Sequence, residues 1–337
     1  MRSAAITGIA SHVPDRVVSN DDLARDFPGW TAPKILEKTG ISERRVAAEG
    51  ETAADLAVQA ANRLLDRMAV PRSSIDFLLF CTQTPDHYLP ATACLLQDRL
   101  GLGRHAGALD YNGGCSGFVY GLGLAKGLIE AGLASRVLLL TSDTYSKVMH
   151  PGDRSVCTLF GDGAAATLVE AEEADEPALG PFVFGTDGGG GKHLIVKAGG
   201  FRQPHSPETA ALSTDSSGNV RSADNLYMNG PEILTFALRR VPEAVSELLR
   251  LSKATVDAFD LVVMHQANAF ILSKLRDKLK IPTERFVVDM SHVGNTVSSS
   301  IPLALERHLG RGEGRRRRAM VVGFGVGYSW AAASISI

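Results

Sequence analysis

Cys115 is the residue best placed by its neighbours to do chemistry. It lies in the segment NGGCSG at 112–117, directly before a stretch with helical spacing. Glycines ahead of a side chain allow a sharp turn from a strand into a helix. The positive end of a helix dipole favours the thiolate form of a cysteine at that position. We therefore expect Cys115 to act as a nucleophile, the alternative being a small buried thiol in a tight turn.

The remaining cysteines have no such setting. Cys81, Cys94 and Cys157 lie inside apolar patterns without flanking glycines, and we expect them to belong to the core. No two cysteines form a CxxC pair, so the sequence predicts no metal site.

Two further residues follow predicted strands or glycine turns. His265 comes directly after the apolar run at 260–264, and ligands gather at the carboxyl ends of strands in α/β sheets. An imidazole can donate a hydrogen bond or accept a proton near neutral pH, although a buried structural histidine is equally compatible. Asn295 stands in the turn VGNTV at 293–297. Its amide is a donor that cannot lose its proton, and a helix N-cap is the alternative role.

The elements that must position these residues alternate along the chain. Apolar runs predict strands buried on both faces at 76–81, 136–141, 167–170, 260–264 and 320–324. Helical spacing predicts helices at 52–68, 116–131, 231–251, 270–280 and 298–309. This alternation indicates an α/β fold.

The chain contains a diffuse internal repeat. Three pairs of segments resemble each other in one order: 74–85 with 258–268, 112–132 with 292–312, and 136–146 with 318–329. We interpret them as two copies of one unit. The half at 1–175 carries the cysteine, and the half at 176–337 carries the histidine and the asparagine. Repeat symmetry would bring Cys115 and Asn295 to facing helix starts. The polar stretch at 201–222 is expected to form a surface loop.

Composition excludes several classes of protein. The 337 residues are 45% hydrophobic and 21% charged, as in ordinary globular proteins, with a net charge of −2. No global field therefore attracts nucleic acid, and no apolar run has the length of a membrane span. Four cysteines without paired spacing indicate reduced thiols and a cytoplasmic location.

Four motifs in one order resemble a known family. GGCSGF (113–118), MHQAN (264–268), VGNTVSSSIP (293–302) and GFGVGYSW (323–330) are similar to the β-ketoacyl-acyl carrier protein synthase III group of the thiolase superfamily. The resemblance covers nearly the whole chain. It implies a five-layered αβαβα thiolase-like fold of two similar halves, a homodimer, a Cys115–His265–Asn295 triad and no cofactor.

The resemblance also implies a reaction. An acyl group from acyl-CoA or an acyl carrier protein (ACP) would move to Cys115, with the oxyanion bound by the backbone N–H groups of Cys115 and Val326. Malonyl-ACP would then lose CO2, and its enolate, bound by His265 and Asn295, would attack the acyl group to give a β-ketoacyl thioester. The alternative is an acyltransferase that passes the Cys115-bound acyl group to an alcohol or amine. A catalytically silent subunit or a cysteine hydrolase fits the triad less well.

Other positions match the family more loosely. Arg154 resembles an arginine that holds the pantetheine-bearing nucleotide, and Asn268 resembles a residue that supports the histidine and the pantetheine. Leu89 falls where the partner subunit closes the acyl pocket. The family's adenine-stacking tryptophan position falls at Lys34, with Trp30 four residues earlier, so both CoA and a carrier protein stay open as acyl donors.

A basic helical stretch and the departures from the family pattern complete the predictions. The stretch is either a solvated face or a landing patch for an acidic carrier protein, and it consists of Lys274, Arg276, Lys278 and Lys280. Lys34, Phe270 and Val326 depart from the family pattern, which favours a member of a specialised lipid or polyketide pathway.

Overall fold

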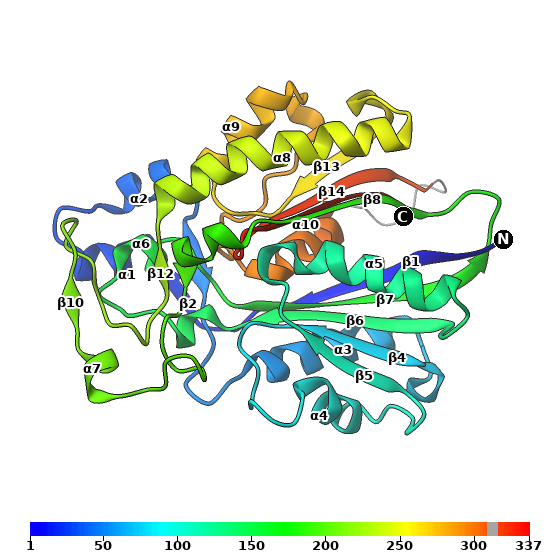
Figure 1. Ribbon diagram of the computed structural model, residues 1–337, viewed down its shortest axis with the longest axis horizontal. Coiled ribbons are helices and arrows are strands. Elements are labelled where there is room, and N and C mark those ends of the chain that lie inside the picture. Colours follow the sequence, from blue (N-terminus) through cyan, green and yellow to red (C-terminus); the bar gives the residue numbers. More distant parts are fainter. Residues whose placement is uncertain (309–315) are drawn as a thin grey trace.

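Two β-sheets stacked on a shared pair of helices form the frame of the molecule (Figure 1). The computed structural model describes residues 1–308 and 316–337. The first sheet has the order β1 (Arg2–His12), β7 (Gly163–Glu173), β6 (Arg136–Asp143), β4 (Phe77–Cys81) and β5 (Gly107–Tyr111). The second has the order β13 (Leu261–Met264), β14 (Arg318–Gly325), β15 (Ser329–Ser336) and β8 (Leu179–Thr186).

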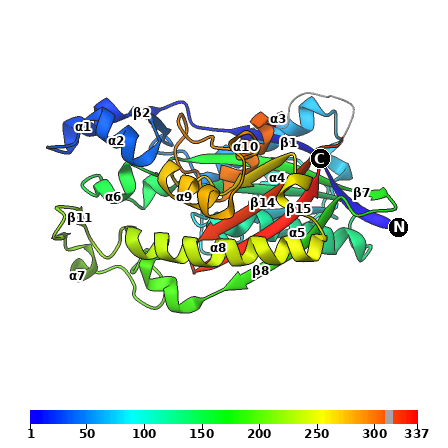
Figure 2. The ribbon, with the colours of Figure 1, turned by 90° about the horizontal axis from the view of Figure 1, so that it is seen from above.

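Helices fill the remaining three layers. Between the sheets lie α5 (Gly117–Glu130) and α10 (Ser300–His308), whose apolar side chains share one core cluster with both sheets. The outer face of the first sheet is covered by α3 (Ala53–Arg67) and α4 (Thr92–Arg99). The outer face of the second is covered by α8 (Gly230–Ser252) and α9 (Ala269–Leu279), which Figure 2 shows from above. The expected five-layered αβαβα fold is confirmed.

Strand β6 shows why continuous apolar runs form these sheets. Leu138 and Leu140 point into the outer cluster under α3, whereas Val137 and Leu139 point into the central cluster around α5. Because successive side chains of a strand face opposite sides, a strand between two helical layers needs apolar residues at every position.

The two sheets repeat one pairing pattern. In the first sheet β4 runs parallel to β6, which is antiparallel to β7, which is antiparallel to β1. In the second, β13, β14, β15 and β8 pair in the same way. The pattern breaks at one place, because β5 has no strand as its counterpart among the described residues. A single parallel bridge between Val262 and Phe286 stands there instead.

The expected elements are present, with small differences in length. The strand expected at 167–170 extends to Gly163–Glu173, and the helix expected at 298–309 begins as a 3-10 turn, Val297–Ser299, before α10. Residues 309–312, the end of that helix and of one repeat segment, lie outside the described residues.

The stretch at 201–222 is more ordered than the predicted loop. It contains α7 (Pro207–Ala210) and a small hairpin of β10 (Ser213–Thr214) and β11 (Val220–Arg221). The Asp215 carboxylate holds the hairpin turn, because it accepts hydrogen bonds from the Ser217 N–H at 2.8 Å and the Arg221 guanidinium at 2.6 Å.

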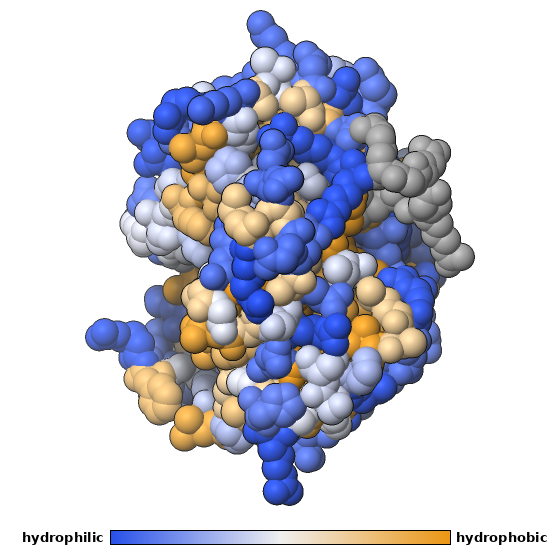
Figure 3. All heavy atoms as spheres, turned by 90° about the vertical axis from the view of Figure 1, so that its right-hand side faces the viewer, coloured by the Kyte–Doolittle hydropathy of each residue, from blue (hydrophilic) through white to orange (hydrophobic). Residues whose placement is uncertain are grey.

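Short elements surround the end of the molecule opposite the chain termini. They are β2 (Val17–Ser19), α1 (Asn20–Asp26), α2 (Ala32–Thr39), β3 (Glu43–Arg45), α6 (Arg154–Cys157), β9 (Leu194–Ile195) and β12 (Tyr227–Met228). The other end presents hydrophilic side chains with small apolar patches between them (Figure 3). Within the described residues, no helix is long and apolar enough to cross a membrane.

Candidate active site

Cys115, His265 and Asn295 line one cavity of about 150 Å³. All three are buried. Cys115 lies in the 3-10 turn Gly114–Ser116 that leads into α5, His265 directly follows β13, and Asn295 precedes the turn that leads into α10. The two pseudo-equivalent helix starts therefore meet at this cavity, as the repeat predicts.

Glycines are required around Cys115 because the backbone packs closely there. Gly114 has φ +50, and a Cβ on Gly117 would collide with the Cys81 sulfur. At the end of β14, a Cβ on Gly325 would lie 2.8 Å from the Cys115 Cβ and 2.9 Å from its sulfur. The turn that holds Cys115 thus lies tightly between β4 and β14, and no larger residue fits at these points.

The Cys115 thiol differs from the sequence-based expectation in its acidity. Burial, followed by the negative charge of Asp143, raises its pKa to about 12. The N–H groups of Val326 and Cys115 donate to the sulfur and act in the opposite direction. The expectation that the helix start favours the thiolate is therefore wrong for the closed cavity, since desolvation of the anion outweighs these donors.

His265 is neutral, and its ring contacts the Ser300 hydroxyl and the backbone of Val297. Burial lowers its pKa to about 3. Its Nδ1 lies 2.7 Å from the Ser300 hydroxyl oxygen, which also accepts a hydrogen bond from the Gln266 N–H at 3.3 Å. A backbone hydrogen bond with Val297 acts against the effect of burial on the pKa of His265. In the tautomer in which the Ser300 hydroxyl donates to Nδ1, the imidazole proton lies on Nε2.

Asn295 lies against His265 and is fixed through its backbone. Its Nδ2 is 3.4 Å from His265 Nε2 and donates to the Ala267 carbonyl at 3.3 Å. Its N–H donates to Leu159 at 2.9 Å, and its carbonyl accepts from the Gly161 N–H at 3.0 Å. The amide of Asn295 is therefore held in place by a segment of the N-terminal half.

The rest of the cavity is mainly apolar. Its wall includes Leu159, Phe160, Leu194, Met228, Ile233, Ile271 and Phe324. Asn268 also lines it, but its side-chain oxygen accepts from the Ile271 N–H at 2.8 Å as the N-cap of α9. An apolar lining has a low dielectric constant, and this strengthens the hydrogen bonds of the polar groups in the cavity.

Arg154, Trp30 and Lys34 form a separate cluster near the surface. The Arg154 guanidinium carbon lies 4.7 Å from the centre of the Trp30 ring, and the Lys34 amine lies 4.9 Å from it. Lys38, which sequence reasoning missed, lies 5.8 Å from the same ring. Trp30 thus provides an aromatic face beside three cations, although the family's adenine-stacking tryptophan position falls at Lys34.

Leu89 and the basic residues of α9 are not in the cavity. Leu89 is 86% exposed. Arg276 pairs with Asp277 at 2.9 Å, and Lys278 donates to the Leu238 carbonyl at 2.8 Å. Lys280 lies beyond the helix, as its left-handed cap. Only part of the expected basic patch is therefore free of contacts within the chain.

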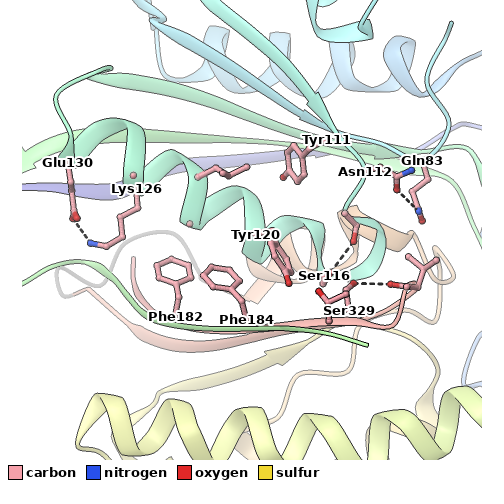
Figure 4. Close-up of a pocket in the computed structure, with 17 residues that line it drawn as sticks. Gln83, Tyr111, Asn112, Ser116, Tyr120, Lys126, Glu130, Phe182, Phe184 and Ser329 are labelled. Carbon is pink, nitrogen blue, oxygen red and sulfur yellow. Dashed lines mark hydrogen bonds and ion pairs between the residues drawn. The ribbon is translucent and has the colours of Figure 1, made fainter. Parts of the chain in front are cut away.

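A larger groove of about 910 Å³, which the sequence did not reveal, runs along α5 (Figure 4). Phe182 and Phe184 of β8 line one side, and Tyr111 of β5 lines the other. At its inner end lie Ser116 and Val326, the neighbours of Cys115 and Gly325. The groove therefore reaches the turn that holds Cys115.

Comparison with known proteins agrees with this geometry. The family model of 3-oxoacyl-[acyl-carrier-protein (ACP)] synthase III matches residues 109–188, and the model of its C-terminal part matches 249–337. A β-ketoacyl-[acyl-carrier-protein] synthase III of Caldanaerobacter subterraneus subsp. tengcongensis is 34% identical over 99% of this chain and 97% of its own length. A β-ketoacyl-[acyl-carrier-protein] synthase III 3 of Streptomyces coelicolor is 39% identical over 99% and 97%.

A solved structure gives the same result in three dimensions. The crystal structure of a 3-oxoacyl-(acyl-carrier-protein) synthase III superposes with a TM-score of 0.97 at 56% identity, covering 99% of this chain and 100% of the other. Fold and cavity define a thiolase-fold protein with a cysteine, a histidine and an asparagine enclosed together. The chain belongs to the β-ketoacyl-acyl carrier protein synthase III family, whose members are acyltransferases that need no cofactor.

Proposed function

We propose that the protein moves an acyl group from a thioester to Cys115 and condenses it with malonyl-ACP to give a β-ketoacyl thioester. The observation that carries this proposal is the convergence of Cys115, His265 and Asn295 on one buried cavity. The family membership of the chain supports the same reaction.

In the first step the Cys115 sulfur attacks the thioester carbonyl. The carbonyl oxygen becomes an oxyanion that the N–H groups of Cys115 and Val326 bind, and both already point at the sulfur. When the carbon–sulfur bond of the donor breaks, the donor thiol leaves with the proton that Cys115 gives up. The enzyme then carries the acyl group on Cys115.

In the second step the malonyl thioester loses CO2, and the released electron pair forms an enolate. His265 Nε2 and Asn295 Nδ2, 3.4 Å apart, donate hydrogen bonds to the enolate oxygen. The carbanion attacks the acyl carbonyl, and Cys115 leaves as a thiolate and regains a proton. One preorganised donor of this kind is worth about 10²–10³ in rate.

The test incubates the protein with labelled malonyl-ACP and a panel of acyl thioesters, and follows CO2 release together with the mass of Cys115. We expect an acyl mass on Cys115 and CO2 release in equal amounts with product. Cys115→Ala should abolish loading. Asn295→Ala should load normally and release CO2 about 10²–10³ times more slowly.

The result that would contradict the proposal is an acyl-enzyme that forms without CO2 release. If an added alcohol or amine then discharged it, the protein would be an acyltransferase to a heteroatom. Loss of acyl loading in Asn295→Ala would contradict the role given to its amide.

We further propose that Trp30, Lys34, Arg154 and Asn268 bind the pantetheine-bearing substrate. Support comes from the stacking of Arg154 on Trp30, a geometry suited to a planar or phosphorylated group of acyl-CoA or acyl-ACP. Within the basic patch, Lys280 and Lys274, which lies over the Phe270 ring, are more available to acidic ACP than Arg276 and Lys278, which have polar partners in the chain.

We propose that two copies of the chain pair through the face that carries the groove. Support comes from Leu109 on the edge strand β5, Leu124 on α5 and Phe184 on β8, which are 47%, 44% and 47% exposed. Exposed apolar side chains gathered on one face indicate an interface. In such a pair, Leu89 would close the groove of the partner.

Two smaller proposals concern organisation and location. We propose that the chain consists of the halves 1–175 and 176–337, since the strands of the first sheet end at Glu173 and those of the second begin at Leu179. We also propose a cytoplasmic location, which the four unpaired cysteines support.

A further inference from the structure

Asp143 is a fully buried carboxylate for which the proposed reaction has no use. It ends β6 with an exposed fraction of 0%. Its Oδ1 accepts a hydrogen bond from the Gln83 N–H at 2.7 Å, and its Oδ2 accepts from the Ser298 N–H at 3.2 Å and from the Ser298 hydroxyl. No Lys, Arg or His among the described residues pairs with it. A buried charge without a cation is costly, so its presence asks for a reason.

Both partners of Asp143 contact the turn that holds Cys115. The Gln83 side chain donates to Asn112 at 2.6 Å, and a Cβ on Gly114 would lie 2.7 Å from its oxygen. Ser298 lies on the other side of the turn's end, where a Cβ on Gly117 would lie 3.8 Å from the Ser298 Cβ. The carboxylate therefore connects Gln83 in one half with Ser298 in the other, and both residues lie beside the turn that holds Cys115.

The groups that act electrostatically on Asp143 are thiols, phenols and a carboxyl. Cys81 of β4, Tyr111 of β5, Cys115, Tyr145 and Asp162 interact with it electrostatically. Burial raises the pKa of Asp143 to about 7, and its charge in turn raises the pKa of Cys115. Near neutral pH the carboxyl therefore gains or loses its proton, and its charge acts on the Cys115 thiol.

We infer that Asp143 is a positioning residue that holds the Cys115 turn through Gln83 and Ser298, and that its negative charge suppresses the thiolate of Cys115 in the free enzyme. A thiol that stays protonated until a thioester arrives is protected from stray electrophiles and oxidants. The inference deepens the proposed function, because it gives the resting nucleophile a control that only substrate binding would overcome.

The test measures the rate at which iodoacetamide alkylates Cys115 in the full-length protein. Mass spectrometry of the Cys115 peptide separates this reaction from that of the exposed Cys94. Rates are compared from pH 5.5 to pH 9 for the wild type, Asp143→Asn and Ser298→Ala. Ser298→Ala is the matched control, since it removes a hydrogen bond of the clamp and keeps the charge.

Below about pH 6 the carboxyl of the wild type is protonated, so Asp143→Asn should react at the wild-type rate. Above pH 8 the carboxylate is charged only in the wild type. We therefore expect Asp143→Asn to react at least about tenfold faster, because a nearby negative charge disfavours the thiolate. Ser298→Ala should keep the pH-dependent step of the wild type, moved to higher pH, because the hydrogen bond that is lost helps to lower the pKa of Asp143.

A rate ratio between Asp143→Asn and the wild type that stays constant from pH 5.5 to pH 9 would overturn the inference. If Asp143→Asn does not fold, Asp143→Ser gives the same comparison. The wild-type profile alone is also decisive, because it must show a shoulder near pH 7. Alkylation needs no substrate, so a failure here is distinct from a failure to release CO2 in the condensation assay.

Discussion

At the residue scale, two small side chains decide what His265 can do. Ser300 lies against Nδ1 and Asn295 lies beside Nε2. A neutral imidazole with its proton on Nε2 can donate to an oxyanion without first being charged. Because burial opposes the charged ring, the donor stays available over the physiological pH range.

Ser300→Ala should slow CO2 release from malonyl-ACP by about 10- to 100-fold, since a buried hydrogen bond to the ring is lost. Acyl loading of Cys115 should stay within about twofold of the wild type, and both rates are read in the same mass-spectrometric assay. Ser299→Ala is the matched control, because the Ser299 hydroxyl bonds to Thr141 and Gly163 and not to His265. Equal slowing by both variants would refute a specific role for Ser300.

Protonation of His265 should also show in the stability of the protein. Its pKa is about 3 when folded and near 6.5 when unfolded. Between these values the unfolded chain binds one more proton, so stability is lost as the pH falls below about 6.5. Urea unfolding should show His265→Gln gaining stability relative to the wild type, on the order of a few kcal/mol between pH 7 and pH 4. A difference that does not depend on pH would contradict a buried, neutral His265.

At the element scale, the end of β14 sets the position of the nucleophile. Gly325 approaches Cys115 so closely that even a methyl group lacks room. The position of the Cys115 side chain therefore depends on a glycine far away in the sequence.

Gly325→Ala should reduce the rate of Cys115 acylation by at least about tenfold, because overpacking shifts the sulfur relative to its N–H donors. Gly188→Ala is a suitable control, since a Cβ there would meet no atom within 4 Å. Thermal unfolding accompanies the acylation assay, and unchanged acylation in folded Gly325→Ala would show that the contact is tolerated.

The elements themselves could be predicted because their signals are local. Apolar runs such as 136–141 predict a strand, and glycine segments such as 112–117 predict a turn, from a few neighbouring residues alone. The hairpin around Asp215, the groove along α5 and the high pKa of Cys115 could not be predicted, because each depends on which distant segments pack there. Asp143 and Ser300 were missed for a related reason, since a single polar residue beside an apolar run has no pattern of its own.

At the scale of the whole molecule, apolar side chains are exposed in a way that a monomer gives no reason for. Leu109, Leu124 and Phe184 are all partly exposed, and Figure 4 shows Phe184 beside α5 in the groove. Tyr88 and Leu89 also protrude, with exposed fractions of 71% and 86%.

Leu124→Asp should convert the proposed dimer to a monomer, because a charge would be buried in the interface. Sedimentation velocity measures the change, and condensation activity should fall with it. Leu133→Asp, at a more exposed leucine beyond the end of α5, serves as the control. A wild-type protein that sediments as a monomer at micromolar concentration would contradict the pairing.

The bond between Asp143 and Ser298 spans 155 residues of sequence. Contacts of such separation form late, since a long loop must close before they can stabilise the protein. During synthesis the first half leaves the ribosome well before the second. The newly made Cys115 therefore passes through a period in which its turn has no contacts with the second half. Its thiol reaches its final environment only when the last strands have folded.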